Sequence, residues 1–128
     1  MIYVDASFII ALVIEKDKWH ERALELLPKL KTEDKYITEA MMIESLNLIG
    51  SSLGGKVGYS IFKYITDNYN IYHSETLIDE SMHYFLKYDA TLSLADCTAI
   101  NTMKELGISE ILSFDDDFDK VEGIVRVY

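Results

Sequence analysis

The chain has 128 residues, and this length predicts a single domain over residues 1–128. Its composition, 49% hydrophobic and 12% aromatic, excludes a disordered chain. Twelve basic against 22 acidic residues give a formal net charge of −10, which argues against a broad basic surface for duplex nucleic acid. A smaller nucleic-acid site stays open, because bound cations can reverse the local charge.

The first half of the chain alternates apolar strands with amphipathic helices. We expect a buried strand at 2–4 and a short apolar helix at 7–14. Asp17 can cap the next helix, and Pro28 should end or kink that helix near Leu27. The remaining predicted elements of this half are a strand at 35–38 and helices at 40–51 and 56–67.

The second half continues the alternation. Ser93 and Asp96 have the spacing of a capping box at a helix start, and Gly107 should end that helix. Around it we expect a strand at 70–73, a helix at 76–88, and strands at 110–114 and 124–128. Strands that alternate with helices throughout predict a three-layer α/β/α fold with a central parallel sheet covered on both faces.

Cellular context follows from the cysteine and the N-terminus. The single cysteine, Cys97, cannot form an internal disulfide, and we expect it to be a core residue of a cytoplasmic protein. Asp5 interrupts the first apolar run and no basic region precedes it, unlike in a signal peptide. The apolar segment 6–14 is too short to span a bilayer, so no membrane contact is expected.

Four acidic residues stand out along the chain: Asp5, Glu44, Asp96 and Asp115. Asp5 and Asp115 follow predicted strands, whose carboxyl ends form the binding edge of parallel sheets. Glu44 lies in a dense apolar helical run and shares a helix face with Asn47. Converging carboxylates repel each other, and a divalent cation removes that repulsion. Metal-assisted phosphodiester hydrolysis is therefore the leading hypothesis, with one or two cations activating water.

Each acid also has a purely structural interpretation. Asp5 can cap the helix that begins at Ser7, and an acid such as Asp96 near a helix N-terminus is stabilising by about 0.3–1 kcal/mol. Glu44 can belong to an exposed polar stripe, and Asp115 can begin a solvated charge run. From single segments these interpretations and the metal hypothesis stay open together.

Asp115 opens a run of acids that the strand geometry should sort. Side chains alternate along a strand, so Asp115 should share a face with Ser113 while Asp116 points away. Asp119 lies further along and is expected outside the site. Asp117 can return through a turn as a supporting residue or a direct ligand.

Together these features resemble the PIN-domain ribonuclease family, particularly the small single-domain toxin nucleases of VapC type. The order and spacing of several pieces carry the likeness, which covers essentially the whole chain. Those pieces are residues 3–7, Thr38 followed by Glu44 and Asn47, residues 92–96 and residues 112–118.

The resemblance implies a site and partners. The family's acidic quartet would be Asp5, Glu44, Asp96 and Asp115, beside its small hydroxyl positions Ser7 and Ser113. We expect Asp5, Asp96 and Asp115 to bind the metal directly, and Glu44 to bind through water or to position the attacking water. Family members hydrolyse RNA with Mg²⁺ or Mn²⁺, commonly as homodimers, and an antitoxin protein holds the toxins inactive. For this chain the resemblance implies a single-stranded or structured RNA substrate.

Two alternatives belong to other classes. A receiver-like phosphoacceptor domain would carry a second acid beside Asp5, where Ala6 and Ser7 stand, and would carry a late catalytic lysine that is not evident here. A PIN-like RNA- or protein-binding module without activity is the other alternative, although all four acids are present.

Overall fold

The computed structural model describes residues 1–128. Its elements are β1 (Ile2–Val4), α1 (Ala6–Val13), α2 (His20–Lys31), β2 (Lys35–Thr38), α3 (Glu39–Leu53), α4 (Gly55–Asn68), β3 (Asn70–Tyr72), α5 (Leu77–Lys87), α6 (Leu94–Leu106), β4 (Glu110–Leu112), the 3-10 helix η1 (Asp116–Lys120) and β5 (Val125–Val127). No helix is both long enough and apolar enough to cross a membrane.

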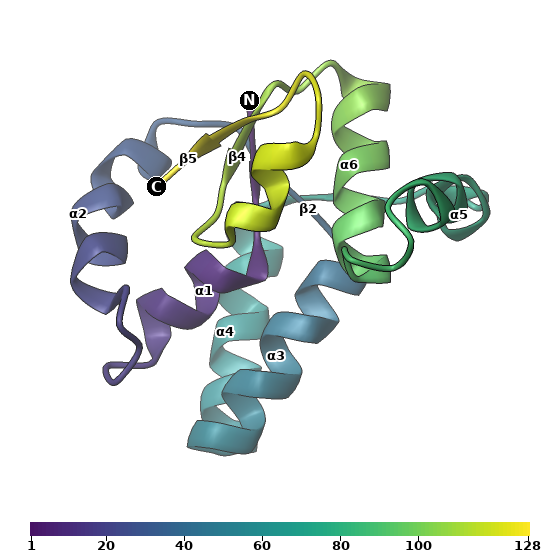
Figure 1. Cartoon of the computed structure of the whole chain (residues 1–128). Coiled ribbons are helices and arrows are strands. Elements are labelled where there is room, and N and C mark those ends of the chain that lie inside the picture. Colours follow the sequence, from purple (N-terminus) through teal and green to yellow (C-terminus); the bar gives the residue numbers. More distant parts are fainter.

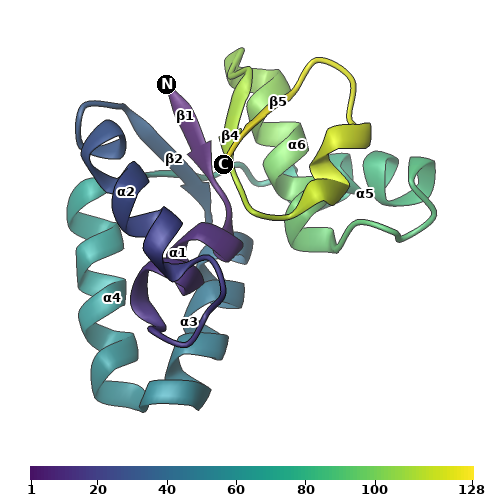
Figure 2. The same ribbon diagram turned by 60° about the vertical axis from the view of Figure 1, so that its left-hand side comes forward.

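Five parallel strands form one sheet in the order β3-β2-β1-β4-β5. β1 is the central strand, and Tyr3 pairs with Tyr36 on one side and Ile111 on the other. Helices α1, α2 and α4 lie on one side of the sheet, with α5 and α6 on the other (Figures 1 and 2). The expected three-layer α/β/α architecture is confirmed, and the strand order reverses between β1 and β4. Ligands bind at such a reversal, outside the carboxyl ends of the strands.

The apolar patterns account for the buried core. Every residue of β1 is fully buried, as are Ile37 of β2 and Ile111 of β4. Cys97 of α6 is also fully buried and free, which confirms it as a core residue. The capping box of Ser93 and Asp96 is present, and Gly107 ends α6 in the left-handed conformation at φ 69°. A residue with a Cβ would be strained at that φ.

Helix α2 differs from its prediction at both ends. It begins at His20 with Trp19 as its N-cap residue, whereas Asp17 accepts from the backbone N–H of Trp19 in the preceding turn. The helix also continues through Pro28 to Lys31, so the predicted end near Leu27 is wrong. Proline removes the bond to the carbonyl four residues earlier. That carbonyl belongs to Leu24, which is exposed, so water can satisfy it.

Strand β4 is shorter than predicted, and the difference matters for the site. It ends at Leu112, not at Phe114. The backbone N–H of Phe114 donates to Ser7 Oγ at 2.9 Å, and that of Asp115 donates to Ser113 Oγ at 3.0 Å. The hydroxyl groups of Ser7 and Ser113 thus accept hydrogen bonds from backbone N–H groups that a longer strand would pair with a neighbouring strand. The alternation used to orient Asp116 therefore does not reach that residue.

Candidate active site

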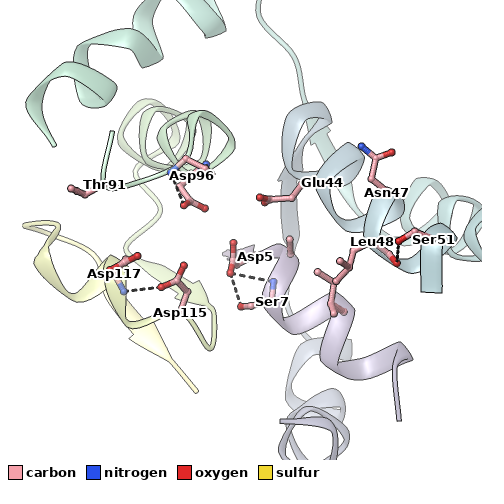
Figure 3. A pocket seen from close by; sticks show the side chains of 13 residues that line it. Asp5, Ser7, Glu44, Asn47, Leu48, Ser51, Thr91, Asp96, Asp115 and Asp117 are labelled. Atoms are coloured by element: carbon pink, nitrogen blue, oxygen red, sulfur yellow. Dashed lines mark hydrogen bonds between the residues drawn. The ribbon is translucent and has the colours of Figure 1, made fainter. Parts of the chain in front are cut away.

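One cleft opens at the carboxyl ends of β1 and β4, and its walls are acidic (Figure 3). All four quartet acids and Asp117 line it, together with Ser7 and Asn47. No lysine, arginine or histidine is among its lining residues, which are Asp5, Ala6, Ser7, Ile10, Glu44, Asn47, Leu48, Ser51, Thr91, Ser93, Asp96, Asp115 and Asp117. Residues from four separate segments thus place five carboxylates around a single space.

Asp5 is the best-held acid of the cleft. It caps helix α1, and its Oδ2 accepts from the backbone N–H of Ser7 at 3.3 Å, from Ser7 Oγ at 2.5 Å and from Ser113 Oγ at 2.8 Å. Its Oδ1 makes no hydrogen bond within the chain, and no buried side-chain oxygen lacks a partner, so Oδ1 faces the cleft. Burial raises the pKa of Asp5, the two serines lower it, and the charge of Asp115 raises it.

The two serines also join distant parts of the chain. Each donates its hydroxyl proton to Asp5 and accepts a backbone N–H from the segment after β4. Ser113 is fully buried beneath the cleft and does not line it. With their protons committed to Asp5, Ser7 and Ser113 orient that carboxylate and set the path of the chain toward Asp115.

Asp96 combines a capping role with a place in the cleft. Its Oδ2 accepts from the backbone N–H of Ser93 at 3.1 Å, and its own N–H donates to Ser93 Oγ at 3.1 Å. Burial and the nearby charge of Asp5 raise the pKa of Asp96 to about 7, with a further contribution from Glu44. Burial therefore favours the protonated form of Asp96, and no basic side chain lines the cleft to favour the charged form.

Asp115 caps the 3-10 helix η1, and its Oδ1 accepts from the backbone N–H of Asp117 at 2.9 Å. Asp115, Asp116 and Asp117 each bring a carboxylate oxygen within 4.8 Å of the others, and no other three acids, histidines or cysteines come so close. Asp116 nevertheless lies outside the acidic cleft and lines a hollow with Trp19 and Arg126. Asp119 lies outside the cleft as well.

Glu44 reaches the cleft from the middle of α3, beside Asp5 and opposite Asp96 and Asp115 (Figure 3). It is exposed, and its carboxylate accepts no hydrogen bond from the chain. Partial desolvation at the cleft wall raises the pKa of Glu44, and the charges of Asp5 and Asp115 raise it further. Asn47 lies one turn further along the same helix and also lines the cleft.

Three buried hydroxyl groups hold the helices that line the cleft in place. The sequence did not single them out as a set. The Tyr3 hydroxyl lies 3.0 Å from Thr38 Oγ1, which lies 2.9 Å from Thr98 Oγ1. Thr38 also caps α3, the helix that carries Glu44, and Thr98 follows Asp96 by two residues on α6. The chain of hydroxyls therefore ties both helices to β1. Nothing in the local sequence around these residues marks the contact.

Comparison with known proteins agrees with this geometry. VapC20 of Mycobacterium tuberculosis, a sarcin–ricin loop cleaving toxin, shares the fold with a TM-score of 0.88 at 23% identity, over 99% of this chain and 98% of that one. A toxin–antitoxin complex from Klebsiella pneumoniae gives 0.69 at 16% identity, over 98% and 96%. VapBC2 from Rickettsia felis, bound to a promoter DNA fragment, gives 0.68 at 13% identity, over 99% and 98%.

Comparison of the sequence with known families identifies one family. No curated protein sequence matches the chain significantly. The model of the PIN domain, in contrast, matches residues 2–124, which include β1 and all the acids of the cleft. With the parallel sheet and the VapC-like fold, this match makes the chain a member of the PIN domain family.

Proposed function

We propose that this protein is an endoribonuclease that hydrolyses RNA phosphodiester bonds with the help of Mg²⁺ or Mn²⁺. The observation that carries the proposal is the cleft itself, in which five carboxylates face one space without any basic side chain in its lining. The cleft measures about 740 Å³, a size that admits a nucleotide-sized group. Its position at the reversal of strand order is where α/β folds bind ligands.

The donor set fits a hard divalent cation. Mg²⁺ and Mn²⁺ prefer oxygen ligands, and Asp5, Asp96 and Asp115 each keep one carboxylate oxygen free of hydrogen bonds. Burial raises the pKa values of Asp5, Glu44 and Asp96, and the negative charges of neighbouring cleft acids raise them further. A divalent cation held there would supply the charge that activates water and stabilises the leaving oxygen.

The residues take distinct roles in this proposal. Asp5, Asp96 and Asp115 would be direct ligands of one or two cations, and Glu44 would bind through water or position the attacking water. Ser7 and Ser113 keep Asp5 oriented through their hydroxyl groups. Asp117 supports Asp115 through its backbone N–H, and the Asn47 amide offers donors to a phosphate oxygen at the edge of the cleft.

We further propose that the protein is the toxin of a toxin–antitoxin pair, acts in the cytoplasm and forms a homodimer. Structural neighbours from Klebsiella pneumoniae and Rickettsia felis were solved as toxin–antitoxin assemblies, which supports an antitoxin partner here. Large apolar side chains are exposed along α3 and α4 and could meet such partners, namely Ile43, Leu48, Leu53, Val57 and Tyr59. Because VapC20 cleaves the sarcin–ricin loop, structured RNA belongs among the first substrates to test.

A receiver-like phosphoacceptor function finds no support. Receiver domains such as CheY have the strand order 2-1-3-4-5, whereas this sheet runs β3-β2-β1-β4-β5. No lysine lines the cleft either. The remaining alternative is a binding module without activity, and a cleavage assay distinguishes it from a nuclease.

The decisive experiment is a cleavage assay. Purified protein is incubated with a mixed RNA pool that contains single-stranded and structured RNA, with Mg²⁺, with Mn²⁺ or with chelator. We expect cleavage only with a divalent cation, and none by an Asp115→Asn variant prepared in the same way. Equal cleavage in chelator would contradict the metal requirement. RNA binding without cleavage under every condition would favour the inactive module.

A further inference from the structure

Arg126 on β5 contacts both ends of the segment that carries Asp115 and Asp117. Its Nε and Nη2 donate to the two carboxylate oxygens of Asp119 at 2.9 Å and 3.0 Å. Its Nη1 donates to the backbone carbonyl of Ser113 at 3.3 Å. We call residues 113–119 the acid loop. One guanidinium group therefore clamps the first and last residues of this loop.

Packing holds the arginine of this clamp, whereas its partner Asp119 is 54% exposed. The Arg126 side chain is only 8% exposed, although it is charged. Its guanidinium carbon lies 3.7 Å from the centre of the Tyr128 ring, which covers it. Exposed ion pairs contribute little to stability, but a bidentate pair held by packing also fixes geometry.

The side chain of Ser113 connects this clamp to the cleft. The Ser113 hydroxyl donates to Asp5 and accepts from the backbone N–H of Asp115, while its carbonyl accepts from Arg126. Ser113 is thus held from two sides, by a cleft acid and by an arginine that does not line the cleft. Arg126 forms an ion pair with Asp119 and with none of the cleft acids, so its effect on them is through geometry.

We propose that Arg126 is a positioning residue, which fixes the acid loop so that Asp115 and Asp117 face Asp5 across the cleft. The expected effect on cleavage rests on the proposed function, whereas the expected effect on the position of the loop rests on the contacts above. Arginine is required because its planar fork reaches Asp119 and the Ser113 carbonyl at once. A lysine at this position offers a single ammonium group and cannot hold both ends of the loop.

The protein contains its own reporter of the acid loop. Trp19 is the only tryptophan, and its ring stacks on Phe114, with centroids 4.8 Å apart and planes 1° apart. Phe114 lies between Ser113 and Asp115. Movement of the acid loop should therefore change Trp19 emission, whether or not the protein cleaves RNA.

The chain also offers a matched control. Arg22 is the only other arginine, and it too contacts the C-terminal segment, through Tyr128 O at 3.0 Å. Its second partner is Glu25, in its own helix, and it has no contact with the acid loop. Arg22→Gln therefore removes the same charge and a neighbouring contact but leaves the clamp intact.

The experiment compares Arg126→Gln, Arg126→Lys, Asp119→Ala and Arg22→Gln with the wild type. For each folded variant, Mn²⁺ affinity, the cleavage rate at saturating Mn²⁺ and Trp19 emission are measured. Loss of a residue that orients metal ligands typically costs about 10–100-fold in affinity or activity, and we expect this of Arg126→Gln. Asp119→Ala removes the exposed partner of the same ion pair and should cause a similar loss. Arg126→Lys should lose less affinity and activity than Arg126→Gln. Arg22→Gln should match the wild type.

Two results would overturn the inference. One is wild-type Mn²⁺ affinity and Trp19 emission in both Arg126→Gln and Asp119→Ala. The other is an equal loss in Arg22→Gln, which would assign the effect to general anchoring of the C-terminal segment. If the wild type fails to cleave RNA with any divalent cation, the proposed function fails. Trp19 emission across the same variants then still decides whether Arg126 positions the loop.

Discussion

The acids of the cleft are held in two different ways. Asp5, Asp96 and Asp115 all lie at helix N-termini, and one carboxylate oxygen of each accepts a hydrogen bond from a backbone N–H of its own turn. Glu44 lies in mid-helix, exposed and without a hydrogen bond to its carboxylate. The three capping acids are thus fixed in advance, whereas Glu44 can adapt.

This contrast changes how a capping acid should be interpreted. Capping and metal binding looked like competing roles for Asp5, Asp96 and Asp115, yet one oxygen can cap while the other faces the cleft. The helix N-termini also direct their positive ends toward the carboxylates, which lowers the cost of keeping them close together. Three helix starts, of α1, α6 and η1, therefore support charges that no basic side chain offsets.

The largest effect is expected from Asp5→Asn. The amide oxygen can still accept from Ser7 and Ser113, so the fold should persist, but the charge that holds a cation is lost. We expect the cleavage rate to fall at least about 1000-fold, equivalent to roughly 4 kcal/mol in the barrier. Asp17→Asn is the matched control, because Asp17 makes the same kind of contact, to the N–H of Trp19, outside the cleft. More than a tenth of the wild-type rate in Asp5→Asn at saturating Mn²⁺ would contradict this assignment.

An intermediate effect is expected in the pH dependence of the metal-free protein. The pKa of Asp96 is about 7 in the folded chain and 3.8 in its ordinary state, so the folded protein binds this proton more tightly than the unfolded chain. The free energy of unfolding should then fall as pH rises from about 4 to about 7, by up to about 1.4 kcal/mol per pH unit. Asp5 and Glu44 shift in the same direction and add to this loss.

Thermal unfolding in chelator between pH 5 and pH 8 measures this slope. Asp96→Asn should flatten it and raise the melting temperature at pH 8, because the amide keeps a capping oxygen and carries no charge. Asp79→Asn, in the first turn of α5 and outside the cleft, should keep the wild-type slope. Asp119, whose pKa Arg126 lowers, acts only below this pH range. A melting temperature that rises steadily toward pH 8 would show that folding does not raise the pKa values of these acids, by burial or by repulsion.

Sequence reasoning succeeded where the signal is local. An apolar run of three residues marked β1, and the capping spacing of Ser93 and Asp96 marked the start of α6. Because parallel strands end at a common edge, the acids after β1 and β4 could be placed near each other without a structure.

It failed where distant side chains decide the outcome. The end of β4 depends on Ser7, which takes the N–H of Phe114 from more than 100 positions away. The clamp of Arg126 on Asp119 and Ser113 and the Tyr3–Thr38–Thr98 contacts likewise join separate elements. Polar residues of this kind carry no periodic pattern, so the contacts that hold the acid loop could not be predicted, although Asp115 itself was expected in the site.

The smallest effect is expected from Glu44→Gln, and it tests the contrast between the capping acids and Glu44 most directly. If Glu44 acts through water from an adaptable side chain, an amide of the same length keeps part of its role. We expect a loss of about 10-fold in cleavage rate, or roughly 1.4 kcal/mol, with little change in Mn²⁺ affinity. Glu39→Gln, on the exposed first turn of the same helix, should show no loss. A loss as large as that of Asp5→Asn, with Mn²⁺ binding abolished, would instead make Glu44 a direct ligand, equivalent to the capping acids.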